Sequence, residues 1–327
     1  MTHPGRPRVT IVTPYTAAAN NGNWHTAARW ASFLRRALPV TVEQAWSGAP
    51  CDLLIALHAS RSADSIVRFA VAHPGRPLVV VLTGTDLYRD LAVSEEARQS
   101  LELATRLVVL NELGPRRLPP HVRGKAEVIL QSAHPLPATR RPGDHLSIAV
   151  VGHLREEKNP RLVWALLKRL PPDLPLRIRH VGDALDPELA AEARAAMQDG
   201  RYRWLGGLPR TRAREVIRSS HLLLHPSSME GGAQALIEAV TSHTAVLASG
   251  IDGNAGLLGE DYGGLFTEND VDAAGELVLR AARRRRFLDH LRRQCERRAP
   301  LFCPQREQAK VLRLVDNCLS EPKRPNQ

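Results

Sequence analysis

Short apolar runs rich in Val, Leu and Ile recur along this chain, with helix-like segments between them. A run of this length that is apolar throughout is typical of a parallel strand buried on both faces. Strand, loop, helix and strand in succession form the βαβ unit of α/β proteins. In the first part of the chain we expect strands at Val9–Thr13, Val40–Gln44, Leu53–Leu57, Leu78–Leu82, Leu107–Leu110 and Val128–Leu130.

The alternation restarts after Ser132–His145, a segment rich in Pro and charged residues that has the composition of a linker between domains. A chain of 327 residues is long enough for two domains. We therefore predict two doubly wound, Rossmann-like domains, residues 1–140 and 141–327, with the function in the cleft between them and ligands at the carboxyl ends of the strands. The second series of expected strands is Leu146–Val151, Arg177–Val181, Tyr202–Leu205, Leu222–His225 and Thr244–Ala248, with helices from about Asp270 to the C-terminus.

A net charge of +11 raises the question of a nucleic-acid partner. Aromatic residues make up only 4% of the chain, which leaves few rings for stacking on bases. Much of the basic excess lies in the first half and around Arg283–Arg286, a segment that we interpret as a solvated helix face. These features disfavour a basic nucleic-acid-binding protein, which is kept as the non-enzyme alternative.

The cysteines Cys51, Cys295, Cys303 and Cys318 form no CxxC pair and have no His neighbours at metal-binding spacing. We therefore expect neither a disulfide framework nor a zinc site. The apolar run at the N-terminus is too short for a signal peptide, and no stretch reaches the roughly 18 apolar residues of a membrane span. The expected location is the cytoplasm.

The most informative motif is Pro226–Glu238, in which a predicted strand is followed by a glycine-rich turn and a helix. The amides of Gly231 and Gly232 at the helix start can bind a phosphate, because a helix N-terminus carries partial positive charge and free N–H groups. Glu230 and Glu238 can both approach one ligand, with Glu230 on sugar hydroxyls and Glu238 on a ribose. An isolated pair at this spacing would be a surface charge and a tight turn, but its place after a strand favours binding.

A second motif, Val151–Pro160, follows the first predicted strand of the second domain. Gly152 allows the backbone to approach a ligand closely. Arg155 and Lys158 can neutralise the charge that develops on a diphosphate leaving group. The alternative is a solvated loop, which two adjacent glutamates in the motif would favour.

Polar residues also follow the predicted strands of the first domain, and they converge if its sheet is parallel. The loop after the first strand has no GxGxxG pattern, which disfavours a dehydrogenase. Neither a G-x-S-x-G elbow nor an H-E-x-x-H motif occurs, so hydrolase triads and zinc proteases have no support. His58 is also a candidate structural histidine. The candidates for binding an acceptor are Asn20, Asn21, Gly22, Asn23, His58, Arg61, Thr83, Gly84, Thr85 and Asp86.

Together these motifs resemble those of the GT-B glycosyltransferases of the large retaining family 4, over nearly the whole chain. The resemblance implies donor-sugar contact for Glu230, ribose contact for Glu238 and diphosphate contact for Lys158. His153 stands where the family usually has an arginine, so Arg155 is the expected replacement. The catalytic candidates are Arg155, Lys158 and Glu230, and the donor-binding candidates are Gly152, His153, Gly231, Gly232 and Glu238.

A narrower resemblance, carried by Asn20–Trp30 and Thr83–Tyr88, is to the selenosugar synthases of selenoneine biosynthesis. It implies transfer of a sugar from UDP-GlcNAc or UDP-glucose to selenophosphate, with formation of a carbon–selenium bond. Selenium in this anion is already a nucleophile, so no strong general base is required. The alternative acceptor is a hydroxyl group in cell-surface glycan synthesis. We expect no cofactor and no metal beyond the UDP-sugar co-substrate, because basic side chains and helix-terminal amides would neutralise the diphosphate.

Overall fold

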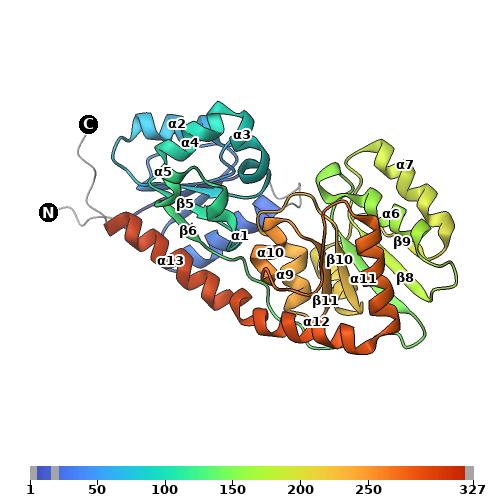
Figure 1. Ribbon diagram of the computed structural model, residues 1–327. Coiled ribbons are helices and arrows are strands. Elements are labelled where there is room, and N and C mark those ends of the chain that lie inside the picture. Colours follow the sequence, from blue (N-terminus) through green and yellow to red (C-terminus); the bar gives the residue numbers. More distant parts are fainter. Residues whose placement is uncertain (1–5, 16–21, 321–327) are drawn as a thin grey trace. The chain divides into compact units, whose positions relative to one another are not determined.

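The computed structural model describes residues 6–15 and 22–320, and the chain divides into two compact units (Figure 1). The first unit comprises Met1–Gln131 together with Pro304–Gln327, and the second comprises Ser132–Cys303. This division differs from the expected ranges 1–140 and 141–327 in two respects. The linker segment belongs to the second unit, and the end of the chain returns to the first.

The first unit is built on a wholly parallel six-stranded sheet in the order β2-β1-β3-β4-β5-β6. Its central strands are buried along their whole length, as their continuous apolar sequences require. The strands are β1 (Val9–Val12), β2 (Val40–Glu43), β3 (Leu53–Leu57), β4 (Leu78–Leu82), β5 (Arg106–Val109) and β6 (Ala126–Val128).

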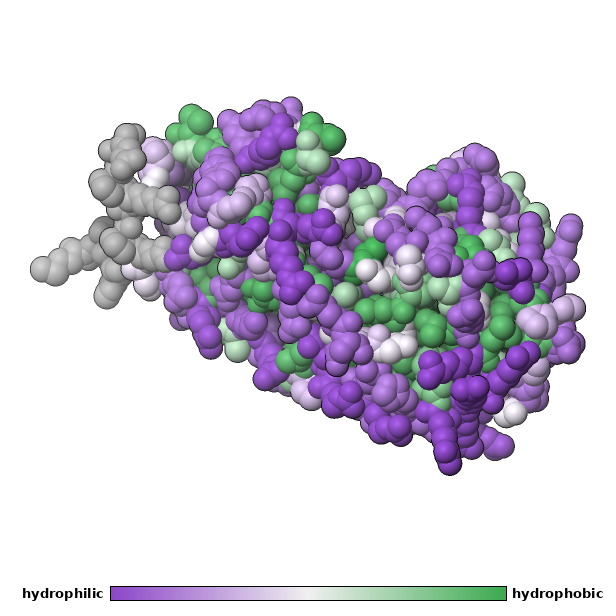
Figure 2. Space-filling view, in the orientation of Figure 1, coloured by the Kyte–Doolittle hydropathy of each residue, from purple (hydrophilic) through white to green (hydrophobic). Residues whose placement is uncertain are grey.

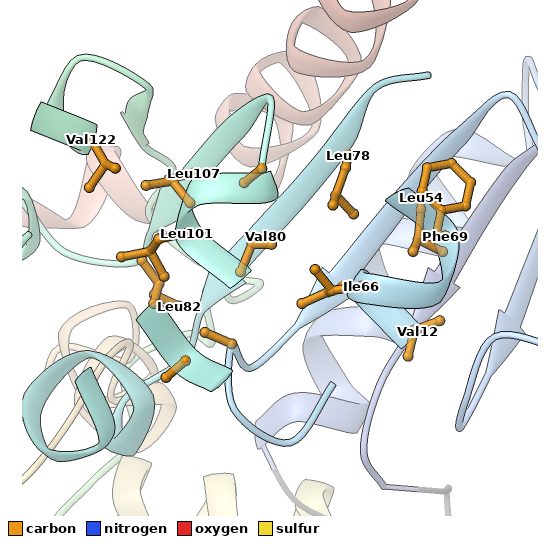
Figure 3. Packing of buried hydrophobic residues seen from close by; sticks show 14 of the residues in the cluster. Val12, Leu54, Ile66, Phe69, Leu78, Val80, Leu82, Leu101, Leu107 and Val122 are labelled. Carbon is orange, nitrogen blue, oxygen red and sulfur yellow. The ribbon is translucent and has the colours of Figure 1, made fainter. Parts of the chain in front are cut away.

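Alternate residues of these strands enter two hydrophobic clusters, one on each face of the sheet. On one face Leu54 and Val80 pack with Ile66 and Phe69 of α2, as Figure 3 shows. On the other face Ile55 and the other set of strand residues pack with α1. The helices of this unit are α1 (Gly22–Leu34), α2 (Ala63–Ala72), η2 (Asp86–Asp90), α3 (Leu91–Val93), α4 (Glu95–Leu103), η3 (Gly114–Arg117), α5 (Pro120–Arg123) and α13 (Pro304–Ser320).

The last helix, α13, packs against α1 and β3 of the first unit. It contributes Val311, Leu314 and Val315 to the cluster that contains Trp30, so its apolar face is buried on this sheet. Glu307 of α13 is also buried, and its carboxylate accepts hydrogen bonds from Trp30 Nε1 (2.9 Å) and Arg29 Nε (2.8 Å). These contacts explain why the C-terminal segment belongs to the first unit.

The second unit has the same design, with a parallel six-stranded sheet in the order β12-β11-β10-β7-β8-β9. Its strands are β7 (Leu146–Val151), β8 (Leu176–Val181), β9 (Tyr202–Trp204), β10 (Leu222–His225), β11 (Ala245–Ser249) and β12 (Leu265–Phe266). Its helices are η4 (Glu156–Lys158), α6 (Pro160–Arg169), α7 (Pro187–Ala196), η5 (Met197–Asp199), α8 (Arg210–Arg218), α9 (Gln234–Val240), α10 (Asp252–Leu258), α11 (Val271–Arg283), α12 (Arg285–Arg298) and η6 (Ala299–Phe302). The prediction of two doubly wound, Rossmann-like domains is confirmed.

No helix within residues 6–15 and 22–320 is both long enough and apolar enough to cross a membrane.

Candidate active site

Several predicted donor-site residues lie at the carboxyl ends of neighbouring strands in the second unit. Gly152 follows β7, and the loop that carries Glu230 follows β10, which pairs with β7. The two loops are joined directly, because the backbone N–H of Ser228 donates to the carbonyl oxygen of Glu157 at 3.0 Å. Parallel pairing therefore brings the two motifs together, as the sequence predicted.

Glu230 is a buried carboxylate held between two basic side chains. Its Oε1 lies 2.5 Å from Lys158 Nζ and 2.9 Å from His225 Nε2, and its side chain is 8% exposed. Burial raises the pKa of Glu230, but the nearby charges and hydrogen bonds of Lys158 and His225 outweigh burial and hold the pKa well below its usual range. The site therefore holds a carboxylate whose ionised form is stabilised by its neighbours, beside a partly buried lysine.

The loop that carries Glu230 is fixed from behind by α10. A Cβ atom on Gly253 would lie 1.9 Å from the carbonyl oxygen of Glu230, so only glycine allows this approach. Ser249 Oγ donates to the carbonyl oxygen of Ser227, and Asn254 Nδ2 donates to Ser249 Oγ at 3.0 Å. These residues were missed from the sequence, because α10 was not predicted and its small residues match no motif.

The loop after β7 is packed as closely as the loop that carries Glu230. A Cβ atom on Gly182, where φ is +155°, would lie 1.9 Å from the carbonyl oxygen of Gly152. A Cβ atom on Gly152 would lie 3.3 Å from Lys158 Cδ, so this glycine leaves room for the lysine stem. His153 Nδ1 accepts a hydrogen bond from the backbone N–H of Asp183 at 3.1 Å. His153 is thus anchored to the end of β8.

Arg155 lies in the same loop as Lys158 and is partly buried. Its Nε is buried and has no hydrogen-bond partner among the described residues. A buried N–H without a partner is costly, and a bound anion would satisfy it. Arg155 therefore retains donor capacity beside Lys158.

Glu238 lies within α9 and is also buried. Arg210 Nε donates to Glu238 Oε1 at 2.8 Å, and Arg214 Nε lies 3.9 Å from the same oxygen. Both arginines belong to α8, and Arg210 lies 28 residues before Glu238, so sequence spacing gave no sign of them. Glu238 is therefore an ion-paired group.

Gly231 and Gly232 lie in the bend before α9, which begins at Gln234. Their amides therefore lie just before the first helical residue, at the approach to the helix start. Ala233 occupies the position immediately before the helix, and no side chain caps it. The two glycine amides lie in the turn between Glu230 and the helix.

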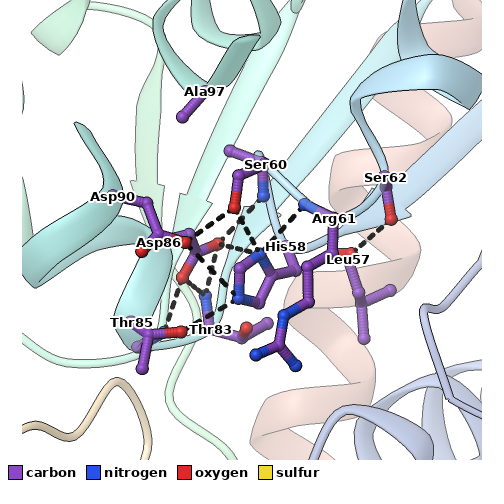
Figure 4. Close-up of polar contacts among 12 residues, drawn as sticks. Leu57, His58, Ser60, Arg61, Ser62, Thr83, Thr85, Asp86, Asp90 and Ala97 are labelled. Atoms are coloured by element: carbon purple, nitrogen blue, oxygen red, sulfur yellow. Dashed lines mark hydrogen bonds and ion pairs between the residues drawn. The ribbon is translucent and has the colours of Figure 1, made fainter. Parts of the chain in front are cut away.

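In the first unit, Asp86 and His58 form a buried polar cluster at the carboxyl ends of β3 and β4 (Figure 4). The Asp86 carboxylate accepts the backbone N–H groups of Ala59 (3.0 Å), Thr83 (2.9 Å) and Gly84 (2.8 Å). Three backbone N–H groups are therefore hydrogen-bonded to this carboxylate. Asp86 ties two strand ends together, which differs from the expected role of direct acceptor contact.

Both nitrogens of the His58 ring are engaged as well. Nε2 lies 3.0 Å from Thr85 Oγ1, and Nδ1 accepts the backbone N–H of Arg61 at 3.4 Å. His58 adopts a left-handed backbone conformation with φ of +75°, which is uncommon for a residue with a side chain. The structural interpretation of this histidine fits these contacts.

Arg61 is the exposed cation beside this cluster. Its guanidinium lies over the ring of Tyr15, 5.1 Å from the ring centroid. Gly22 and Asn23 open helix α1, and Gly22 accepts a hydrogen bond from Thr26 Oγ1 at 2.8 Å. The candidates Asn20 and Asn21 lie outside the described residues.

A match to a protein family decides the broad identity of the chain. Residues 137–301, half of the sequence, match the model of the glycosyl transferases group 1 family. This protein belongs to that family. The matched segment contains every donor-side candidate from Gly152 to Glu238, whereas the candidates of the first unit lie outside it.

Solved structures share the fold of this glycosyltransferase over both units. HepE from Anabaena, in complex with UDP and glucose, is 16% identical with a TM-score of 0.75, and the match covers 95% of this chain and 100% of HepE. Sucrose-phosphate synthase from Thermosynechococcus elongatus is 13% identical with a TM-score of 0.78, over 95% of this chain and 99% of that enzyme. A glycosyltransferase from Rickettsia africae is 12% identical with a TM-score of 0.71, over 97% of this chain and 100% of that one. The predicted GT-B fold is confirmed.

Proposed function

We propose that this glycosyltransferase transfers a sugar from a UDP-sugar, UDP-GlcNAc or UDP-glucose, to selenophosphate. The observation that carries the donor half is the buried Glu230 beside Lys158 and His225 at the carboxyl ends of β7 and β10. The complex of HepE with UDP and glucose supports a uridine diphosphate as the leaving group. The narrower sequence resemblance supports selenophosphate as the acceptor.

In this proposal, Lys158 and Arg155 neutralise the diphosphate. Negative charge develops on the leaving oxygen as the bond to the sugar breaks, and fixed cations in a partly buried site stabilise that charge. Lys158 is held in place by Glu230, and the Nε of Arg155 has a hydrogen bond to offer. The ring of His153 is held in the same loop by its hydrogen bond with the backbone N–H of Asp183.

The two glutamates hold the rest of the donor. Glu230 is ionised, so it accepts hydrogen bonds from sugar hydroxyls. Arg210 and Arg214 both contact Oε1 of Glu238, which makes Oε2 the oxygen for a ribose hydroxyl. The turn of Gly231 and Gly232 follows Glu230 directly and precedes α9, and we assign this turn to the phosphates.

The first unit is assigned to the acceptor. Arg61 supplies positive charge for an anion. The Asp86 carboxylate fixes the backbone of Thr83 and Gly84 by accepting their N–H groups. Both nitrogens of His58 are hydrogen-bonded, so the ring is not presented as a general base. Selenophosphate needs no such base, because a selenium lone pair forms the new bond to the anomeric carbon. The bond from that carbon to the diphosphate oxygen breaks, and its electron pair leaves with UDP.

We expect activity without a metal ion. Basic side chains supply the neutralisation that a divalent cation would otherwise provide. Treatment with EDTA is therefore expected to leave the rate unchanged, and a loss that Mg²⁺ or Mn²⁺ restores would contradict this part of the proposal.

Mass spectrometry of the products tests the proposed reaction. The purified protein is incubated with each UDP-sugar, with and without enzymatically generated selenophosphate. The expected result is a selenium-containing sugar together with UDP. Transfer to a hydroxyl compound, with no selenium product, would agree with the proposed donor site but contradict selenophosphate as the acceptor. The acceptor would then be an ordinary glycan.

A further inference from the structure

Two adjoining cavities lie near the amino ends of strands in the second sheet, whereas the proposed donor residues follow the carboxyl ends. They have volumes of about 810 Å³ and about 740 Å³, and both are lined by Arg141, Pro142, Gly143 and His145. Ser147 and Arg177, near the amino ends of β7 and β8, line the larger one. The donor motifs follow the carboxyl ends of these strands, so the cavities belong to a different part of the unit.

The linings of both cavities are strongly basic. Six arginines line the larger cavity, and Asp144 is the one acidic residue among the described residues that line either. The arginine-rich segment singled out in the sequence contributes here, because Arg283 and Arg285 line the smaller cavity. Figure 2 shows hydrophilic side chains projecting where α11 meets α12. The interpretation of this segment as merely a solvated helix face is therefore incomplete.

The strand register places positive charges directly opposite one another. Arg179 of β8 is paired in register with Arg203 of β9, and both line the larger cavity. Like charges on neighbouring strands repel each other. An anion between these side chains would remove that repulsion.

Two of the lining arginines are fixed by neutral groups. Arg141 donates to the carbonyl oxygens of Ser220 (2.6 Å) and His243 (2.8 Å), and Arg179 donates to Ser220 Oγ at 2.9 Å. None of these partners carries a negative charge, so the hydrogen bonds orient the guanidinium groups without neutralising them. Other lining arginines are ion-paired, Arg201 with Asp199 at 2.6 Å and Arg292 with Asp289 at 3.1 Å. Arg141 and Arg179 are oriented by neutral partners, and preorganised cations of this kind are features of an anion-binding site.

The surrounding electrostatics agree with this geometry. Burial, together with the charge of Arg292, lowers the pKa of Arg141 to about 10. Burial and the charges of Arg292, Arg141 and His145 lower the pKa of His221 to about 4. The Nε of Arg292 is buried and has no hydrogen-bond partner among the described residues. Neighbouring positive charges therefore contribute to the lowered pKa values of Arg141 and His221.

We infer that these cavities bind a small polyphosphate anion, at a site separate from the donor site. The phosphate chain can belong to a nucleoside triphosphate or to free inorganic polyphosphate. Several arginines spread over two joined cavities suit a chain of phosphates better than a single orthophosphate. Because the site is at the amino ends of β7 and β8, a ligand there does not compete with the sugar donor.

Isothermal titration calorimetry of the full-length protein with inorganic tripolyphosphate tests this inference. The exposed pair Arg177→Gln and Arg203→Gln removes two charges from the larger cavity without disturbing the buried hydrogen bonds of Arg141. The matched control pair is Arg293→Gln and Arg297→Gln, which are exposed on α12 outside both linings. We expect binding about tenfold weaker in the first pair, which is about 1.4 kcal/mol, and a change of less than about twofold in the control.

Equal losses in both pairs would show a general charge effect and overturn the inference. Loss of binding in Lys158→Ala alone would place tripolyphosphate in the donor site and also overturn it. Parallel titrations with ATP and orthophosphate identify the source of the phosphate chain. Tighter binding of ATP indicates a nucleotide and equal binding indicates the chain alone, whereas orthophosphate binding as tightly as tripolyphosphate contradicts a polyphosphate site.

Discussion

Lys158 is the residue on which the proposed donor site depends most, because it contacts the buried Glu230 carboxylate and lies beside Gly152 after β7. Its removal has two effects. A diphosphate loses a cation, and a buried carboxylate loses a partner. These effects are separable, since the first acts on the reaction and the second on stability.

Replacing Lys158 with alanine is expected to lower kcat/KM for the UDP-sugar by about 100-fold, because charge on the leaving group is no longer neutralised. Steady-state kinetics measures the effect, and thermal unfolding checks that the variant is folded. Lys168→Ala, an exposed lysine on α6, is the matched control. Similar kinetics in the two variants would remove Lys158 from the site.

Replacing Glu238 with alanine is expected to raise KM for the UDP-sugar by about tenfold with little change in kcat, because a hydrogen bond to ribose is lost equally in the ground and transition states. The control is Glu276→Ala on α11, whose side chain is exposed. If instead kcat falls and KM is unchanged, Glu238 acts on the reacting bond and its assignment to the ribose fails.

At the scale of single elements, β8 carries a buried histidine behind the donor loop. His180 lies on β8 with its Nδ1 2.9 Å from the hydroxyl of Tyr202 on β9. Burial lowers the pKa of His180 from 6.5 to about 4, although a hydrogen bond with the backbone of Gly152 opposes part of that shift. Protonation of His180 at low pH is therefore expected to destabilise β8, the strand that supports Gly152.

This histidine predicts a pH dependence of stability. Between about pH 4 and 6.5 the unfolded chain binds a proton at His180 that the folded protein does not, so the free energy of unfolding falls as the pH falls through this window. We expect the wild type to lose about 2 kcal/mol more than His180→Asn between about pH 7 and pH 5. Urea unfolding at the two pH values measures the difference. The exposed His134→Asn should behave as the wild type does, and identical pH profiles for His180→Asn and the wild type would refute the prediction.

Most elements were predictable from local sequence, and the reason is visible in particular strands. Leu53–Leu57 and Leu78–Leu82 were predicted with the bounds observed, because each is a continuous apolar run between turn residues. The two-residue strand β12 and the helix α10 were missed, since one is too short to show a period and the other is rich in glycine. Their register and packing come from tertiary contacts.

The candidate site was predictable only where motifs at strand ends carry the chemistry. The approach of Glu230 to Lys158 followed from two motifs at neighbouring strand ends. The ion pairs of Glu230 with His225 and of Glu238 with Arg210 could not be predicted, because no pattern in one sequence reports an ion pair. Asp86 was assigned to the acceptor because a polar residue after a strand looks the same whether it binds a ligand or caps a loop.

For the whole molecule, the chain crosses between its two units twice, after Gln131 and again before Pro304. The return of α13 to the first unit was not predictable from composition, because its apolar face would suit either sheet. Its buried Glu307, paired with Arg29 and Trp30 on α1, makes the docking specific. The helix is part of the core of the first unit.

Replacing Glu307 with alanine is therefore expected to destabilise the protein by about 3 kcal/mol, because Arg29 keeps a largely buried charge and Trp30 an N–H group without their carboxylate. Urea unfolding followed by tryptophan fluorescence measures this loss. Arg306→Ala, at the exposed neighbouring position, is the control. A loss no larger than that of the control would show that α13 is held by its apolar face alone.

The claim on which the whole account depends is that the nucleotide-sugar binds at the Lys158–Glu230 edge of the second unit. Calorimetric titration of UDP into the wild type, Lys158→Ala and Lys168→Ala tests it most directly. The account predicts that UDP binds to the wild type and Lys168→Ala alike and at least tenfold more weakly to Lys158→Ala. Equal binding to all three proteins, or no binding to the wild type, would contradict it.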